Sequence, residues 1–396
     1  MSYGDSIWDE ALKRAWDDFC DRIKGASSII FRDTAPPTPL DRASGVQYLS
    51  RYISKALAEK FEFADPLHPQ FWQLQTPTNK SFGDNPDCTY LMAAVDAEHT
   101  YRIVGNRGTV SWVSFNVRGL APASTVSAIN NRDLKTEWDG SFEIIVSPHK
   151  PDGKNWMRNG PGSARLFIRQ FFGEWDTEEP MTIRVERVGQ EDDGPPPPLT
   201  AERLISGLQD AADWMLEDAK RWVDWVDHYR DIPNRFVRTM PAWAGDAAQA
   251  ALNRTLQFCR WHIQADEALL IEVTPPRCSY WNFEMANYWW NSVDYRYRFS
   301  SINGKQAALE DDGSVRIAVS HLDPGIPNWL DTGGHCVGMV NQRWVESEAF
   351  PTPSATLVKV ADLSRILPPG VRRITTQQRR EQLRRRKIGA DRRFRV

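Results

Sequence analysis

Residues 312–344 have the sequence DGSVRIAVSHLDPGIPNWLDTGGHCVGMVNQRW, which predicts a strand, an irregular loop rich in His, Asp, Pro and Gly, and a second strand. The first 18 of these residues align without gaps with Asp139–Trp156, DGSFEIIVSPHKPDGKNW, and nine of the 18 pairs are identical. Two unrelated segments of this length would share roughly one residue, so the match indicates an internal repeat. The repeat predicts that one folding unit occurs twice in the chain.

Short β-rich runs surround both copies of the repeat. They include CTYLMAAV, HTYRIVGN, TVSWVSFNV, ARLFIRQFF and MTIRVERV in the first half, and ALLIEV, YWNFEMANYWW, YRYRFSS and ATLVKVADL in the second. Many short strands separated by turn residues favour an antiparallel sandwich or barrel over a parallel sheet. We expect amphipathic helices over about 6–24, 42–61, 201–228 and 242–259, where apolar residues recur every three or four positions.

These patterns divide the chain into six segments. We expect an N-terminal helical segment, a first β half, a Pro-rich linker, a helical insert, a second β half and a basic C-terminal arm, at residues 1–82, 83–190, 191–199, 200–264, 265–366 and 367–396. The N-terminal helices are expected to cap one end of a β domain. Residues 120–135 are expected to form a polar connection without a strand.

Composition is typical of a globular protein, with 41% hydrophobic and 26% charged residues. The 17 Trp residues fill sandwich cores or line a cavity for an apolar or sugar-like ligand. Five scattered cysteines without a CxxC pair argue against a disulfide framework or a structural zinc site. No apolar run is long enough to span a membrane, and no leader pattern is present, so we expect a cytoplasmic protein.

Charge is concentrated in the C-terminal arm. Residues 371–396 contain 11 Arg and Lys against two acids, Glu381 and Asp391, whereas the whole chain has a net charge of −3. A basic arm on an acidic body predicts docking onto a second subunit, and hence a homo-oligomer. Nucleic-acid binding is the alternative, which we disfavour because QQRREQLRRRK is helix-like and lacks aromatic residues for base stacking.

Several stretches resemble a bacterial family called domain of unknown function 1214. They are EALLIEVTPP, YWNFEMANYWWNSVDYRYRFSSINGKQA, HLDPGIPNWLDTGGH, GDNPDCTY, YRIVGNRG and LFIRQFFGEW. The resemblance covers Gly83–Val188 and Glu267–Leu363, about half of the chain, and implies a β-sandwich of the jelly-roll sort for both halves. We therefore expect a mainly β fold with helical additions, built from two related antiparallel jelly-roll-like sandwiches. The family implies no activity and no catalytic residue.

Ionisable side chains follow the second copy of the repeat strand. His321 continues its apolar face, and Asp323, Asp331 and His335 lie within the next 14 positions, whereas the first copy has Pro148 in the place of His321. This asymmetry suggests that only the second half carries chemistry. A structural, hydrogen-bonded role for a single His at such a position is the more common alternative.

Strand alternation places further candidates on one face. Asn282, Glu284 and Tyr288 lie opposite the face of Trp281, Phe283 and Met285, so they line solvent or a pocket, with Glu284 facing His335 as a base. A solvated carboxylate on an outer sheet face is the alternative.

Two arginines occupy matching places in apolar strands of the two halves. Arg169 and Arg343 stay charged, so each needs a carboxylate partner or an anionic ligand. We expect a structural pair with an Asp or Glu in both halves, with an anionic substrate group at Arg343 as the alternative.

Sequence templates for other chemistry fail. His321, Asp323 and His335 resemble in order the ligands of iron- and oxoglutarate-dependent oxygenases, but only 11 residues separate Asp323 from His335, where that family has several strands. We therefore expect no metal and no cofactor, with a metal held by ligands of this one loop as the alternative. The motifs GxSxG, HExxH, GxxxxGK[ST] and GxGxxG after a strand are absent. Cys336 adjoins His335, but neighbouring strand residues point to opposite faces and should not form a nucleophile–base pair.

The favoured hypothesis from the sequence is an enzyme that performs metal-independent acid–base chemistry on an apolar or alicyclic small molecule. The second sandwich and the helical insert would form its Trp-rich pocket. The predicted catalytic residues are His335, His321, Asp331 and Glu284, with Asp331 orienting a histidine. The predicted substrate-binding residues are Arg343, Trp329, Tyr288 and Asn282. The alternatives are a carbohydrate- or small-molecule-binding tandem jelly roll and an assembly protein held together by the basic arm.

Overall fold

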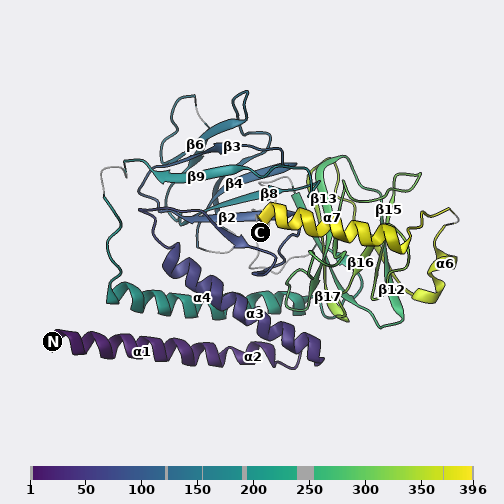
Figure 1. Cartoon of the computed structure of the whole chain (residues 1–396), viewed down its shortest axis with the longest axis horizontal. Helices are drawn as coiled ribbons and strands as arrows, with labels where there is room; N and C mark the ends of the chain where they lie inside the picture. The colour runs from purple at the N-terminus through teal and green to yellow at the C-terminus, as the bar shows by residue number, and fades with distance from the viewer. Residues whose placement is uncertain are drawn as a thin grey trace.

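The computed structural model of the chain describes residues 3–120, 124–153, 155–189, 194–238, 254–368 and 370–394. They form two β-sandwiches that lie side by side, a layer of helices along one side of both, and a C-terminal helix that crosses in front (Figure 1). The expected fold class, mainly β with helical additions and two related halves, is confirmed.

The first sandwich consists of nine strands in two sheets. Its larger sheet has the order β1-β2-β8-β4-β5 and its smaller sheet β7-β6-β3-β9. The strands are β1 Trp72–Gln75, β2 Cys88–Ala94, β3 Tyr101–Asn106, β4 Trp112–Arg118, β5 Thr125–Asn130, β6 Ser141–Ser147, β7 Asn155–Arg158, β8 Arg165–Phe171 and β9 Thr182–Arg187. Inward-facing residues such as Ile103, Phe115, Ile144 and Ile168 are fully buried and form its core.

The second sandwich repeats this arrangement strand for strand. Its larger sheet has the order β10-β11-β17-β13-β14 and its smaller sheet β16-β15-β12-β18, which is the first order with nine added to each number. The strands are β10 Phe236–Val237, β11 Arg254–His262, β12 Glu267–Val273, β13 Cys278–Asn287, β14 Ser301–Asn303, β15 Val315–Ser320, β16 Trp329–Asp331, β17 Val337–Ser347 and β18 Ser354–Lys359. Each smaller sheet contains one parallel pair, β6–β7 or β15–β16.

The hydrogen bonds of the repeat are duplicated as well. The indole of Trp156 donates to the carbonyl of Ser147 at 3.1 Å, and the indole of Trp329 donates to the carbonyl of Ser320 at 3.2 Å. Gly140 and its counterpart Gly313 both have positive φ, which closes the turn before the repeat strand. The identities between the two segments are therefore the residues that fix this strand–loop–strand unit.

Helices cover one side of the molecule. They are α1 Tyr3–Gly25, α2 Ser27–Ile30, α3 Pro39–Leu57, the π-helical turn η1 Ala58–Glu62 and α4 Ala201–His228. The 3-10 turn η4 Val360–Asp362 and helix α6 Leu363–Ile366 lie apart from them, beside the smaller sheet of the second sandwich. Thr38 caps α3 through its hydroxyl, with Pro39 in the first turn, and Thr200 caps α4 in the same way. Helices α1 to α4 pack along the outer face of the larger sheet of the second sandwich, so they form a layer and not the expected end cap.

Helix α7, Thr376–Phe394, is the basic arm, and it docks on its own chain. Its buried arginines are Arg379, Arg386 and Arg393, spaced seven residues apart. Arg386 donates to the carbonyl of Tyr295 in the second half and lies 4.2 Å from the ring centre of Trp175 in the first. The expected docking onto a second subunit stays a prediction, because the contacts described here are all within one chain.

Three sequence-based elements differ from the structure. Residues 254–259 of the expected helix 242–259 belong to strand β11, whose alternating residues pair with β17, and the rest of that helix lies outside the described residues. The expected connection 120–135 contains strand β5. YRYRFSS forms turns until β14 begins at Ser301. Strands β10 and β11, which precede residue 265, belong to the same sheet as β17.

Candidate functional site

The two larger sheets turn their outer faces toward each other between the sandwiches. Aromatic residues of the first half, including Trp112 and Phe171, pack there against Tyr280 and Val345 of the second. The face of Asn282, Glu284 and Tyr288 is therefore buried, and the prediction that it lines solvent or a pocket was wrong: the relative exposure of all three is 0%.

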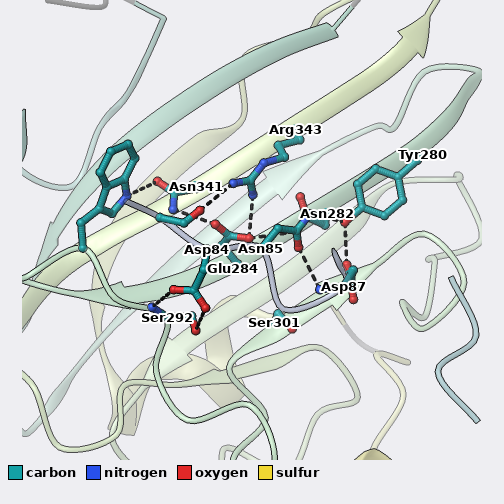
Figure 2. Close-up of polar contacts among 12 residues, drawn as sticks. Asp84, Asn85, Asp87, Tyr280, Asn282, Glu284, Ser292, Ser301, Asn341 and Arg343 are labelled. Carbon is teal, nitrogen blue, oxygen red and sulfur yellow. Dashed lines mark hydrogen bonds and ion pairs between the residues drawn. The ribbon is translucent and has the colours of Figure 1, made fainter. Parts of the chain in front are cut away.

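Asp84, Asn85 and Asp87, which precede β2 of the first sandwich, make polar contacts with residues of the second half (Figure 2). Asp84 accepts hydrogen bonds from the backbone and hydroxyl of Ser292, at 2.9 and 2.7 Å. Asn85 accepts from Asn282 at 2.9 Å and donates to the hydroxyl of Tyr280, which donates to Asp87 at 2.6 Å. The stretch GDNPD, residues 83–87, thus supplies three polar side chains to this interface. Neither strand alternation nor a sequence motif predicted this role.

Glu284 and Arg343 form the ion pair at the centre of this network. Their Oε2 and Nη1 atoms are 2.6 Å apart, and Asn341 donates to the other carboxylate oxygen at 2.8 Å (Figure 2). Burial raises the pKa of Glu284 to about 7, although the attraction of Arg343 acts in the opposite direction. The predicted structural pair is found here, so Arg343 does not present an open anion site and Glu284 does not face His335.

Arg169, the counterpart of Arg343, has no such partner. Arg169 pairs in register with Ser114 of β4, as Arg343 pairs with Asn282 of β13, so Asn116 takes the place of Glu284. Only 7% of Arg169 is exposed, its Nε atom makes no hydrogen bond, and within the described residues it forms no ion pair. The expected carboxylate partner is therefore present in one half and, in the part of the chain described here, missing from the other.

His335 is bound to a residue that the sequence did not suggest. Its Nδ1 lies 2.6 Å from Oδ1 of the buried Asp41, in the first turn of α3, 294 residues away in the chain. Asp331, expected to orient a histidine, instead pairs with Arg298 at 2.9 Å. Cys336 precedes β17 in a turn and not in the strand, and burial and the charge of Asp41 raise the pKa of its thiol.

The remaining predicted site residues are held in structural contacts. Nδ1 of His321 lies 2.9 Å from the hydroxyl of Thr332. Trp329 belongs to the second core and Tyr288 donates to Asp227 of α4 at 2.8 Å. The predicted catalytic set His335, His321, Asp331 and Glu284 is thus distributed over separate hydrogen-bonded groups and does not meet at one cavity among those described.

A cavity of about 430 Å³ lies between the larger sheet of the first sandwich and helix α4. Its wall includes the rings of Phe82, Phe167, Trp214 and Trp222 and the charged residues Glu59, Arg118, Arg165, Glu217, Asp218 and Arg221. The helical insert does contribute a Trp-lined pocket, as expected, but its other wall comes from the first half and not from the second.

Two unusual backbone conformations occur in this wall. Phe82 has a φ of +38°, which an aromatic residue rarely adopts, and Gly83 follows with a φ of +62°. Glu59 belongs to the π-helical turn η1, a geometry that often marks functional sites. Such strain persists only where the surrounding structure maintains it, so both features support this cavity as a candidate site.

The described residues contain no feature that points to a metal site or a membrane span. No group of three or more His, Cys, Asp or Glu in these residues is placed to hold a metal ion. No helix among them is long and apolar enough to cross a membrane. The expected absence of a cofactor stays a prediction from the sequence.

Comparison with known proteins gives a family but no activity. Residues 92–172 and 264–340 match the family described as Protein of unknown function (DUF1214), in corresponding parts of the two halves. The fold is similar to that of an uncharacterised protein from Burkholderia cenocepacia, with 35% identity, a TM-score of 0.83, and coverage of 90% of this chain and 100% of that one. The VPA0106 protein from Vibrio parahaemolyticus is a weaker match, with 13% identity, a TM-score of 0.46, and coverage of 79% of this chain and 98% of that one. No curated protein matches the chain.

Proposed function

The chain belongs to the DUF1214 family of unknown function, and we propose that it binds a small, largely apolar organic molecule in the cavity between the first sandwich and helix α4. The observation that supports this most directly is the cavity itself. Its volume of about 430 Å³ lies in the range of small-molecule sites, and four aromatic residues line it beside six charged ones.

Binding has better support than acid–base catalysis. The carboxylates of the cavity wall are engaged with arginines: Glu59 lies 3.4 Å from Arg165, and Asp218 lies 2.6 Å from Arg221. Burial raises the pKa of Asp218, but hydrogen bonds from Trp222 and Tyr52 hold its Oδ2 atom in place. The histidines that we expected to move protons do not line this cavity.

An apolar ligand fits better than a carbohydrate. Carbohydrate binding by the tandem jelly roll would require exposed, coplanar Trp side chains on a concave sheet face. Several tryptophans are instead fully buried, among them Trp112, Trp225, Trp261, Trp289 and Trp344. The two that line the cavity, Trp214 and Trp222, are partly buried on α4 and not displayed on an exposed sheet face.

The proposal is tested with N-phenyl-1-naphthylamine, a neutral probe whose fluorescence rises on transfer from water to an apolar site. We expect saturable binding of one probe per chain, and at least about a tenfold loss of affinity, which is about 1.4 kcal/mol, in Met92→Trp. Met92 lies on the outer face of β2 in the cavity wall, so a larger ring there fills the space.

The matched control is Leu357→Trp, which adds the same ring at an exposed position of β18 and should leave binding unchanged. If Met92→Trp fails to fold, Trp214→Ala at the helical wall takes its place, because Trp214 is only partly buried. A folded Met92→Trp or Trp214→Ala variant that binds the probe as tightly as the unmodified protein would contradict the proposal.

Two further sequence-based expectations accompany this proposal. A cytoplasmic location and assembly into a homo-oligomer through the basic arm are retained as predictions. Gel filtration of a chain truncated after Thr375 tests the second, since loss of α7 should then reduce the apparent size by whole subunits.

A further inference from the structure

Arg169 does not itself line the cavity, but it adjoins a residue that does. It occupies the central strand β8, on the same outer face as Phe167, two residues away, and its guanidinium carbon is 5.4 Å from the centre of that ring. Phe167 lines the cavity. The guanidinium is buried, with an Nε that donates no hydrogen bond, and no Asp or Glu among the described residues pairs with it.

A buried charge without a counter-charge is costly, because the interior solvates it poorly. Burial lowers the pKa of Arg169, and the nearby charge of Arg343 lowers it further, yet a guanidinium stays protonated at neutral pH. A bound anion would supply the missing counter-charge. The buried guanidinium of Arg169, which has no carboxylate partner among the described residues, therefore favours an anion site over an ordinary apolar cavity.

Arg118 extends this positive charge to the cavity surface. It lines the cavity and lies over the same ring as Arg169, 5.1 Å from the centre of Phe167. Burial lowers the pKa of Arg118 to about 9, and Arg169 and Arg165 add to the effect. The Phe167 end of the cavity thus contains Arg118 and Arg165 with one carboxylate, Glu59, while the α4 end contains the paired carboxylates Glu217 and Asp218.

We infer that the ligand carries a single anionic group of the carboxylate class, which binds beside Phe167 at Arg118 and Arg169. This inference rests on the proposed function and specifies the ligand of the same cavity. The apolar body of the ligand lies against the rings of Phe82, Trp214 and Trp222. Guanidinium groups match carboxylates in geometry and bind them by charge-assisted hydrogen bonds.

The second sandwich provides an internal model for this arrangement. There the corresponding arginine, Arg343, receives the carboxylate of Glu284 from the neighbouring strand. In the first sandwich the corresponding position is Asn116, whose amide donates to the hydroxyl of Ser114 and the carbonyl of Phe167. A ligand carboxylate at Arg169 would play the part that Glu284 plays in the other copy.

The experiment compares two probes of nearly equal shape, 2-naphthoate and neutral 2-naphthamide, by isothermal titration calorimetry. We expect 2-naphthoate to bind at least about ten times more tightly than 2-naphthamide. In Arg169→Met this ratio should fall at least about threefold, because one of the two cations that bind the carboxylate is removed. Asn116→Glu should lower it in the same way, because the new carboxylate competes with the ligand for Arg169.

The control is Arg102→Met, which removes an arginine from the smaller sheet of the first sandwich, where it pairs with Glu143 and Glu186. It should leave the ratio unchanged. If the two probes bind equally, or if both Arg169→Met and Asn116→Glu preserve the ratio, the inference is wrong although the cavity is a binding site. If neither probe binds, both the inference and the proposed function are contradicted.

Discussion

The two sandwiches hold their matching buried arginines in different ways. In the second, Arg343 lies 2.6 Å from Glu284 and also donates to the carbonyl of Gly83 at 3.1 Å. In the first, Arg169 is equally buried, but the residue in the place of Glu284 is the neutral Asn116. The comparison shows that one duplicated strand position is paired with a carboxylate in one copy and, within the described residues, has no such partner in the other.

The largest expected effect distinguishes these two arginines directly. Arg343→Met leaves Glu284 buried without its cation, so we expect the free energy of unfolding to fall by about 3–5 kcal/mol. Arg169→Met removes an unpaired buried charge, so we expect a loss below about 1 kcal/mol, or a gain. Urea denaturation without ligand measures both values, and equal losses in the two variants would refute the difference in pairing.

A smaller loss of stability is expected for the indole hydrogen bond that occurs in both copies of the repeat. Trp329→Phe should cost about 2 kcal/mol and Trp156→Phe about 1 kcal/mol, because each loses an indole donor to the repeat serine and some buried area. The ring of Trp329 is also more buried and lies 5.2 Å from the guanidinium of Arg379. Thermal unfolding compares the variants, and a larger loss for Trp156→Phe would contradict the assignment of this second role.

The titration of Glu284 gives a pH test of the same pair. Its pKa is raised from 4.5 to about 7, so between these values the folded state binds more protons than the unfolded state. The free energy of unfolding therefore falls as pH rises through this window, by at most about 1.4 kcal/mol per pH unit from this group. We expect Glu284→Gln to remove that contribution to the slope.

The measurement is chemical denaturation of the variant and the unmodified protein at several values between pH 5 and pH 8. Glu217→Gln, which changes an exposed carboxylate of α4, serves as the matched control and should leave the slope unchanged. Parallel curves for Glu284→Gln and the unmodified protein would show that Glu284 titrates in its ordinary range.

The smallest change in stability is expected for ion pairs on the smaller sheets of the two sandwiches. Glu143 and Arg316 occupy the same position of the repeat with opposite charges, and each pairs with a neighbouring strand, at 2.8 Å to Arg102 and 2.6 Å to Glu272. These partly exposed pairs contribute little, so Glu143→Ala and Arg316→Ala should each cost less than about 1 kcal/mol, and less still in high salt. A cost above about 2 kcal/mol in either would mean that the pair is structurally essential.

Much of the fold was predictable from local pattern. The residues that are identical between 139–156 and 312–329 form the same turn, strand and indole hydrogen bond in both copies. Because these residues are conserved between the copies, the repeat could be recognised from the sequence. The α4 bounds, residues 201–228, were also predicted correctly, because apolar residues recur at helical spacing between a threonine cap and the helix end. The strand β11 was missed because its short alternating run follows a segment with helical spacing.

The site was far less predictable, because it depends on which surfaces meet. Strand alternation correctly put Glu284 on the face opposite the core, but it gave no information that a second sheet covers that face. Asp41 reaches His335 across 294 residues, and Arg118 and Trp214 meet at one cavity from separate elements. The one useful signal was the pair of matching arginines, whose need for a counter-charge was evident from the sequence.

The most direct test of the account is a crystal structure of the protein grown with 6-bromo-2-naphthoate, in which anomalous scattering locates the bromine. We predict the bromine near the α4 wall of the cavity and the carboxylate within hydrogen-bond distance of Arg169 or Arg118. A carboxylate bound away from both arginines, or an Asp or Glu of the chain itself paired with Arg169, would contradict the account.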